Sequence, residues 1–158
     1  MISINASTDP VLMFGAGYDS LVEDVDPSTV SAVTSTTVTA TSGTYTRSMG
    51  RGLYVVNART GDIIWQARGS ARTDGSTHPY KVVSGMDYSI PSDISVVVGD
   101  STPKPFRAYV GDTGGNVWRI DFARNTGSAT ANNLENTTVT KLAAVGGSGY
   151  AKRKFLFA

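Results

Sequence analysis

Residues 52–65 of the chain read GLYVVNARTGDIIW, and residues 107–122 read RAYVGDTGGNVWRIDF. Each stretch holds a run of β-branched and aromatic residues, a turn with threonine and glycine, and a second run that contains a tryptophan. This pattern of two runs around a tight turn predicts a β-hairpin. Because the hairpin occurs twice, we expect a repeat architecture, and repeated hairpins of this kind are typical of β-propeller blades.

Further short apolar runs, bounded by glycine, proline or polar residues, predict more strands at Val11–Phe14, Tyr80–Val83, Ser95–Val98, Thr137–Val145 and Lys154–Phe157. No window keeps the apolar spacing of an amphipathic helix over three turns. We therefore predict an all-β, propeller-like chain with about two four-stranded antiparallel blades, at residues 11–69 and 82–145. Known propellers close with roughly four to eight blades. Residues 1–158 should thus be one fragment of a larger propeller, with Lys154–Phe157 opening a third blade.

Residues 19–48 differ in composition from the rest of the chain. They hold a few acidic residues, many serines and threonines, and few large apolar side chains. The alternation Thr37-Val38-Thr39-Ala40 could form an edge strand. We expect the segment as a whole to be a long Ser/Thr-rich surface insertion within the fragment.

Composition excludes several classes of protein. A chain of 158 residues with 40% hydrophobic residues can bury a core as one domain. The net charge is only +1, and Lys152–Lys154 is the single short basic cluster, so the sequence indicates no basic surface for binding nucleic acid. There is no cysteine, and no apolar run approaches the roughly 20 residues of a membrane span. Because Met1–Asn5 lacks the charged start and apolar centre of a signal peptide, we expect an excised piece of a longer protein or a cytoplasmic one.

Four motifs resemble a known family. They are FGAGYD at residues 14–19, GRGLYVVNARTG at 50–61, IPSD at 90–93 and YVGDTGGNVWRID at 109–121. In this order they are similar to the C-terminal β-propeller of PilC/PilY-type proteins, and RKFLF at 153–157 resembles the strand that follows in that family. Quinoprotein-type propellers share the general shape of the fourth motif, whereas its combination with the first and third is distinctive of PilC/PilY.

The resemblance implies a non-enzymatic role in type IV pilus assembly and in attachment to surfaces. It implies an exported protein at the cell surface, with pilin-like or minor pilin subunits and a host or abiotic surface as partners. A rigid β-scaffold would display its loops to these partners, in particular residues 19–48 and 69–79. The alternative is an enzyme, a fragment of a quinone-cofactor (PQQ-type) dehydrogenase with the same hairpin pattern. That enzyme would need cofactor-binding charges and a calcium site, which we do not recognise in the sequence.

Some members of the family bind calcium in an aspartate-rich loop, and the corresponding place here is Gly99–Arg107. It has one carboxylate, two prolines and two cations, whereas calcium takes six to eight oxygen ligands, several of them anionic. We therefore expect no cofactor and no calcium in this loop. A second group of carboxylates could gather around a cation or could form an exposed acidic loop, and its spacing fits no EF-hand: Asp19, Glu23, Asp24 and Asp26.

The tryptophans and glycines of the hairpins have a structural interpretation. Trp65 and Trp118 occupy matching places and should be buried between blades. The turn glycines should supply positive φ angles, and they are Gly61, Gly114 and Gly115.

Catalytic interpretations find little support in the sequence. The GAGYDS run at residues 15–20 lacks the third glycine and the helix of a dinucleotide site. His78 is the only histidine and should lie in a surface loop. Asp112 and Asp121 lie beside the second hairpin turn, where a carboxylate commonly accepts backbone N–H bonds. We predict no catalytic residue.

Overall fold

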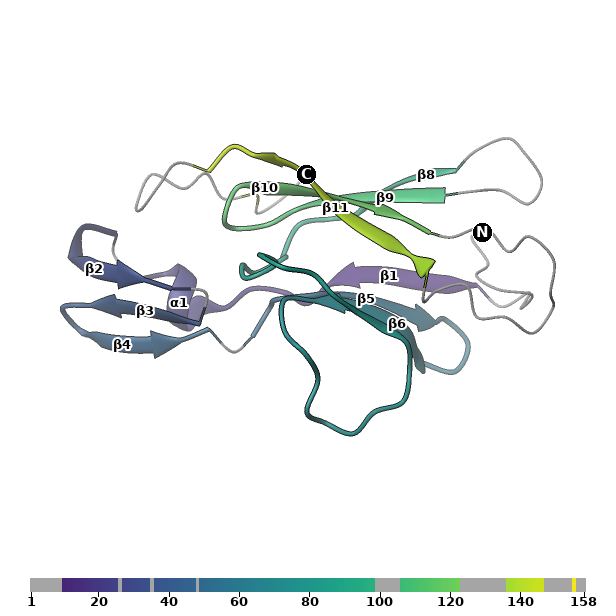
Figure 1. The fold of residues 1–158 in the computed structure, drawn as a ribbon, viewed down its shortest axis with the longest axis horizontal. Coiled ribbons are helices and arrows are strands. Elements are labelled where there is room, and N and C mark those ends of the chain that lie inside the picture. Colours follow the sequence, from purple (N-terminus) through teal and green to yellow (C-terminus); the bar gives the residue numbers. More distant parts are fainter. Residues whose placement is uncertain are drawn as a thin grey trace.

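The computed structural model describes residues 10–25, 27–34, 36–47, 49–98, 106–122, 136–146 and 155. Over these residues it contains eleven strands, one helix of four residues, α1 (Ser20–Glu23), and a short 3-10 helix, η1 (Pro27–Thr29). The strands form two sheets of four and one sheet of three (Figure 1). The prediction of an all-β fold is therefore confirmed. In the described part of the chain, no helix has the length and apolar character needed to cross a membrane.

The first four-stranded sheet has the order β1 (Val11–Gly15), β5 (Leu53–Asn57), β6 (Ile63–Arg68) and β7 (Tyr80–Val82). The first three strands are antiparallel neighbours, whereas β7 runs parallel to β6. The prediction of a fully antiparallel sheet is thus wrong at this edge. A parallel neighbour requires a connection that carries the chain back to the starting end of the sheet. The long segment 69–79 provides that connection.

The second four-stranded sheet keeps the order of the chain and is antiparallel throughout. Its strands are β8 (Ser95–Val98), β9 (Phe106–Gly111), β10 (Asn116–Asp121) and β11 (Thr138–Ala144). The predicted strand at Lys154–Phe157 lies outside the described residues except for Phe155. The N–H group of Phe155 donates to the carbonyl oxygen of Asp112 at 3.2 Å.

The two hairpins quoted from the sequence occupy the same places in their sheets. β5 and β6 are the middle strands of the first sheet, and β9 and β10 are the middle strands of the second. The register is also the same, because Trp65 faces Val55 across one hairpin and Trp118 faces Val110 across the other. The sequence repeat is therefore a structural repeat.

A single apolar core lies between the two four-stranded sheets, which Figure 1 shows one above the other. Both tryptophans are 1% exposed, and the rings of Trp65 and Phe122 meet edge to face with centroids 5.6 Å apart. Burial of an aromatic side chain of this size stabilises the fold by a few kcal/mol. The core is formed by Leu53, Val55, Trp65, Ala67, Val83, Met86, Ile90, Ala108, Val110, Trp118, Ile120 and Phe122.

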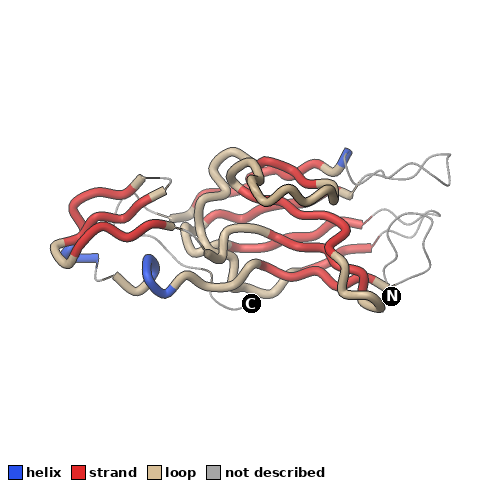
Figure 2. Tube along the Cα trace, turned by 90° about the horizontal axis from the view of Figure 1, so that it is seen from below, coloured by secondary structure: helices blue, strands red, loops and turns tan. Residues whose placement is uncertain are grey.

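The insertion forms a third sheet at one end of the molecule (Figure 2), with the order β2 (Val30–Val33), β3 (Thr37–Ala40) and β4 (Gly43–Thr46). The alternation at residues 37–40 does mark a strand, but β3 lies in the middle of this sheet and not at an edge. The reason is packing, because one face of the small sheet and α1 share a second core of Val22, Val30, Val38 and Ala40.

Candidate interaction surface

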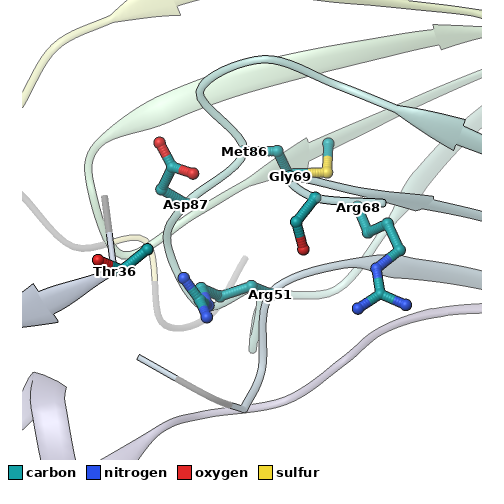
Figure 3. Close-up of a pocket in the computed structure, with 7 residues that line it drawn as sticks. Thr36, Arg51, Arg68, Gly69, Met86 and Asp87 are labelled. Carbon is teal, nitrogen blue, oxygen red and sulfur yellow. The ribbon is translucent and has the colours of Figure 1, made fainter. Parts of the chain in front are cut away.

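The two loops that the sequence singles out for display meet at one pocket (Figure 3). Thr36 contributes from the turn between β2 and β3 of the insertion, and Gly69 and Ser70 contribute from the start of segment 69–79. The pocket has a volume of about 180 Å³. Typical small-molecule sites have roughly 300–1,000 Å³. Its lining consists of Thr36, Arg51, Arg68, Gly69, Ser70, Met86 and Asp87.

The two arginines of the pocket do not converge on one point. Figure 3 shows their guanidinium groups pointing in different directions, with that of Arg51 on the side of Thr36 and Asp87. The pocket therefore offers one cation, one carboxylate and hydroxyl groups at its mouth, rather than a paired clamp for a single anion.

The charge on Arg51 lies in a partly desolvated environment. Burial lowers the pKa of this guanidinium, and the positive charge of Arg47 lowers it further, while Asp87 and Asp19 oppose the shift. Arg47 itself is 5% exposed, and its Nη1 donates to the carbonyl oxygen of Asp87 at 3.1 Å. Its guanidinium carbon also lies 4.4 Å from the centre of the Tyr88 ring. These contacts join the end of β4 to the segment after β7 and hold the insertion against the main body.

Close backbone approach explains why glycine occupies the floor of this junction. A Cβ atom at Gly69 would lie 2.5 Å from the carbonyl oxygen of Met86, and one at Gly50 would lie 2.6 Å from that of Gly17. Gly50 also has a φ angle of +74°, which side chains other than glycine rarely adopt. In the sequence, Gly50 is one residue of the motif at 50–61 and Gly69 belongs to no motif, so their role at the junction could not be assigned from it.

The carboxylates proposed for calcium are directed to separate partners. Asp19 is 1% exposed and its Oδ2 accepts the N–H of Met49 at 3.3 Å, which ties α1 to the residues before β5. Oε1 of Glu23 accepts the hydroxyl of Thr113 at 2.7 Å. Oδ1 of Asp24 accepts the hydroxyl of Tyr18 at 2.5 Å. Among the residues that the structure describes, no group of three or more histidine or acidic side chains could hold a metal ion.

Part of the calcium predictions falls outside the described residues. This applies to the candidate ligand Asp26 and to residues 99–105 of the loop Gly99–Arg107, which we predict to bind no calcium. The prediction that this loop binds no calcium therefore stays a prediction.

Asp112 organises the turn of the second hairpin. It is fully buried, and its Oδ1 accepts the backbone N–H groups of Gly114 and Asn116, each at 2.9 Å. Its Oδ2 accepts Nε1 of Trp118 and Nδ2 of Asn116, each at 2.8 Å. Asp121 makes no pair with it. On the outer face of the sheet, Asp121 instead binds the guanidinium groups of Arg107 and Arg119.

The turn glycines divide into two kinds. Gly61 and Gly115 have φ angles of +82° and +77°, in the region that favours glycine. Gly114 does not, so the prediction of a positive φ is wrong there. Its glycine is required by space, because a Cβ would lie 2.3 Å from Cδ2 of Tyr88.

His78 lies in segment 69–79, as predicted, but it is partly buried against the first sheet. Its Nε2 lies 2.6 Å from Nη1 of Arg72 and 3.1 Å from Oε1 of Gln66. The sequence offers no signal for this cluster, because Gln66 and Arg72 belong to no recognisable motif.

Comparison with known proteins adds no relative, since no protein-family model, curated protein or solved structure matches the chain.

Proposed function

We propose that this chain is a non-enzymatic β-propeller fragment of the PilC/PilY type, with a role in type IV pilus assembly and surface attachment. The observation that carries the proposal is the structural repeat. Two hairpins with the same sequence pattern occupy the same middle positions of two four-stranded sheets, and each buries its tryptophan opposite a valine.

The arrangement of the sheets supports the propeller part of the proposal. Each sheet places its strands side by side in the order of the chain, interrupted only by the inserted small sheet. The two sheets pack face to face through one core. Propeller blades are four-stranded sheets that pack in this manner around a central axis. Two of them would form one sector of a closed ring.

The display of loops supports the role in assembly. Residues 19–48 and 69–79 are far apart in the chain, yet both contribute to the pocket at the junction between the insertion and the main body. The pocket has room for a side chain of a docked polypeptide, with Arg51, Asp87 and Ser70 as polar contacts. An exported protein at the cell surface would present this junction to pilin-like or minor pilin subunits.

The proposal is tested by binding of the purified chain to purified pilin and minor pilin subunits of the source organism, measured by biolayer interferometry. Ser70→Trp fills the pocket at an exposed position, and Ser84→Trp places the same side chain in an exposed turn that does not line it. We expect binding by the natural chain, loss of at least tenfold in affinity for Ser70→Trp, and no change for Ser84→Trp. Absence of binding to every subunit would refute the pilus role, and equal binding by both variants would refute the pocket as its site.

A further inference from the structure

Segment 69–79 projects from the first sheet as a loop on the side away from the second sheet (Figure 1). Gln66 of β6 is directed to this outer face, because its neighbours Trp65 and Ala67 belong to the inner core. It is nevertheless only 4% exposed. His78 lies over it, with Nε2 at 3.1 Å from Oε1 of Gln66. The end of the segment therefore contacts the sheet through His78, while residues 73–77 are exposed.

The protonation state of His78 follows from its neighbours. Nη1 of Arg72 lies 2.6 Å from Nε2 and also donates to the carbonyl oxygen of His78 at 3.1 Å. A guanidinium group has donors only, so Nε2 must be the acceptor and the imidazole must be neutral with its proton on Nδ1. With the Gln66 amide turned so that its NH₂ group replaces Oε1 beside the ring, Arg72 and Gln66 share the single lone pair of Nε2.

Arg72 cannot easily move away from the imidazole. Its side chain is 5% exposed, its guanidinium carbon lies 4.8 Å from the centre of the Tyr80 ring, and its Nε lies 3.2 Å from Oδ1 of Asp74. A proton on Nε2 of His78 would therefore face a fixed cation at hydrogen-bond distance. The hydrogen bond would become a repulsive contact, and the segment can relieve it by leaving the sheet.

The polar and charged groups around His78 come from three elements. Segment 69–79 supplies the charged Arg72 and Asp74, and β7 supplies Tyr80. β6 supplies the neutral Gln66 and also Arg68, whose positive charge acts on Asp74. Burial lowers the pKa of the His78 imidazole and Arg72 lowers it further, while Asp74 opposes them. Hydrogen bonds from Ser76 and the charge of Arg72 lower the pKa of Asp74, so its opposing charge persists in mildly acidic solution.

We propose that His78 is a pH-sensitive latch, which holds segment 69–79 on the sheet while it is neutral and releases the segment when it is protonated. The closed segment disfavours the proton, whereas the open segment binds it with the ordinary pKa of about 6.5. The contribution of the neutral imidazole to closing the segment is therefore fully present above this pH and is lost as the pH falls below it. The opening constant rises by up to about tenfold for each pH unit, until the closed form also takes up the proton. Because Gly69 and Ser70 line the pocket, opening also changes the pocket wall.

Hydrogen exchange of the Gln66 amide, which donates to the carbonyl oxygen of Pro79 at 3.3 Å and so reports on the docked end of the segment, tests the latch between pH 7.5 and pH 5.5, after correction for the intrinsic pH dependence of exchange. We expect protection to fall by up to about tenfold per pH unit below 6.5 in the natural chain. His78→Gln keeps an acceptor for Arg72 and removes the only histidine of the chain, so its corrected protection should not change over this range. Identical pH profiles for the two proteins would overturn the proposal.

An NMR titration of the imidazole gives an independent measurement. His78 should titrate below its ordinary value in the natural chain, and Arg72→Gln should move the titration upward, because the cation that opposes the proton has been removed. Titration at or above the ordinary value in the natural chain would overturn the proposal. If Arg72→Gln does not fold, His78→Gln and the titration of the natural chain still decide the question.

Discussion

The buried carboxylate of Asp112 should be the most sensitive polar group of the described structure. Its two oxygens accept hydrogen bonds from two backbone N–H groups, from the Asn116 amide and from the Trp118 indole. Asp112→Asn has nearly the same shape, but it places an NH₂ group where Oδ2 receives Nε1 of Trp118 and Nδ2 of Asn116. The Trp118 indole then loses its acceptor, whereas Nδ2 of Asn116 keeps its 3.1 Å bond to Oδ1. We expect a loss of about 1–3 kcal/mol in the free energy of unfolding.

Urea denaturation followed by far-UV circular dichroism measures this loss, with Asp121→Asn as the matched control. Asp121 is the same residue type on the same hairpin, but it binds arginines at the solvent-exposed face. Its change should cost no more than about 1 kcal/mol. A double-mutant cycle with Trp118→Phe isolates the indole bond, because the phenylalanine background has no Nε1 donor. Asp112→Asn should then cost about 1–3 kcal/mol less than in the natural chain. A cost for Asp112→Asn equal to that of Asp121→Asn, or a cycle without coupling, would refute the reasoning.

Three further outcomes are expected. Gly114→Ala and Gly115→Ala should both lower the thermal midpoint of unfolding. Adding Tyr88→Ala should restore the midpoint only in Gly114→Ala, because a Cβ at Gly114 meets the Tyr88 ring whereas Gly115 needs its positive φ. If Tyr88→Ala rescued both variants, these two causes would be wrong. Burial and then the hydrogen bond to Asp24 raise the pKa of Tyr18 to about 12. Its contribution to stability should be present below pH 10 and lost as the pH rises from 10 to about 12, and Asp24→Asn should lower the phenol titration seen by NMR. Pyrroloquinoline quinone with calcium should leave the melting temperature unchanged, and a clear rise would favour the dehydrogenase alternative.

Much of the strand order could be predicted because its signals are local. Every predicted strand from Val11–Phe14 to Thr137–Val145 overlaps an observed strand, and Ser95–Val98 agrees at both ends. β-branched runs ended by glycine or proline define such strands without reference to the rest of the chain. The insertion gives a weaker signal, because β2 and β4 have only four residues each and two of the four in β4 are threonine. Their pairing depends on a small shared core with α1 that no single segment reveals.

The candidate site could be predicted only in outline. The sequence identified the two loops, but their meeting depends on the fold, as do the junction arginine Arg47 and the glycines Gly50 and Gly69. Asp112 was recognised as a turn carboxylate, whereas its bond to the Trp118 indole requires coordinates. The cluster of Gln66, Arg72 and His78 arises because the end of segment 69–79 contacts the outer face of its own sheet. Such contacts leave no periodic trace in a sequence.

The pairing of β1 with β5 across the inserted small sheet has a consequence for folding kinetics. Gly15 and Leu53 are direct neighbours in the first sheet, so their encounter must close a loop that contains the whole insertion. Loop-closure entropy opposes such an encounter more than it opposes the local encounters within the insertion or within the β5–β6 hairpin. If β2, β3 and β4 assemble first, they shorten the effective loop and draw the two ends together. The small sheet would then act as a nucleus that speeds the docking of β1, and variants that weaken it would slow refolding by close to their full equilibrium cost, with little effect on the unfolding rate.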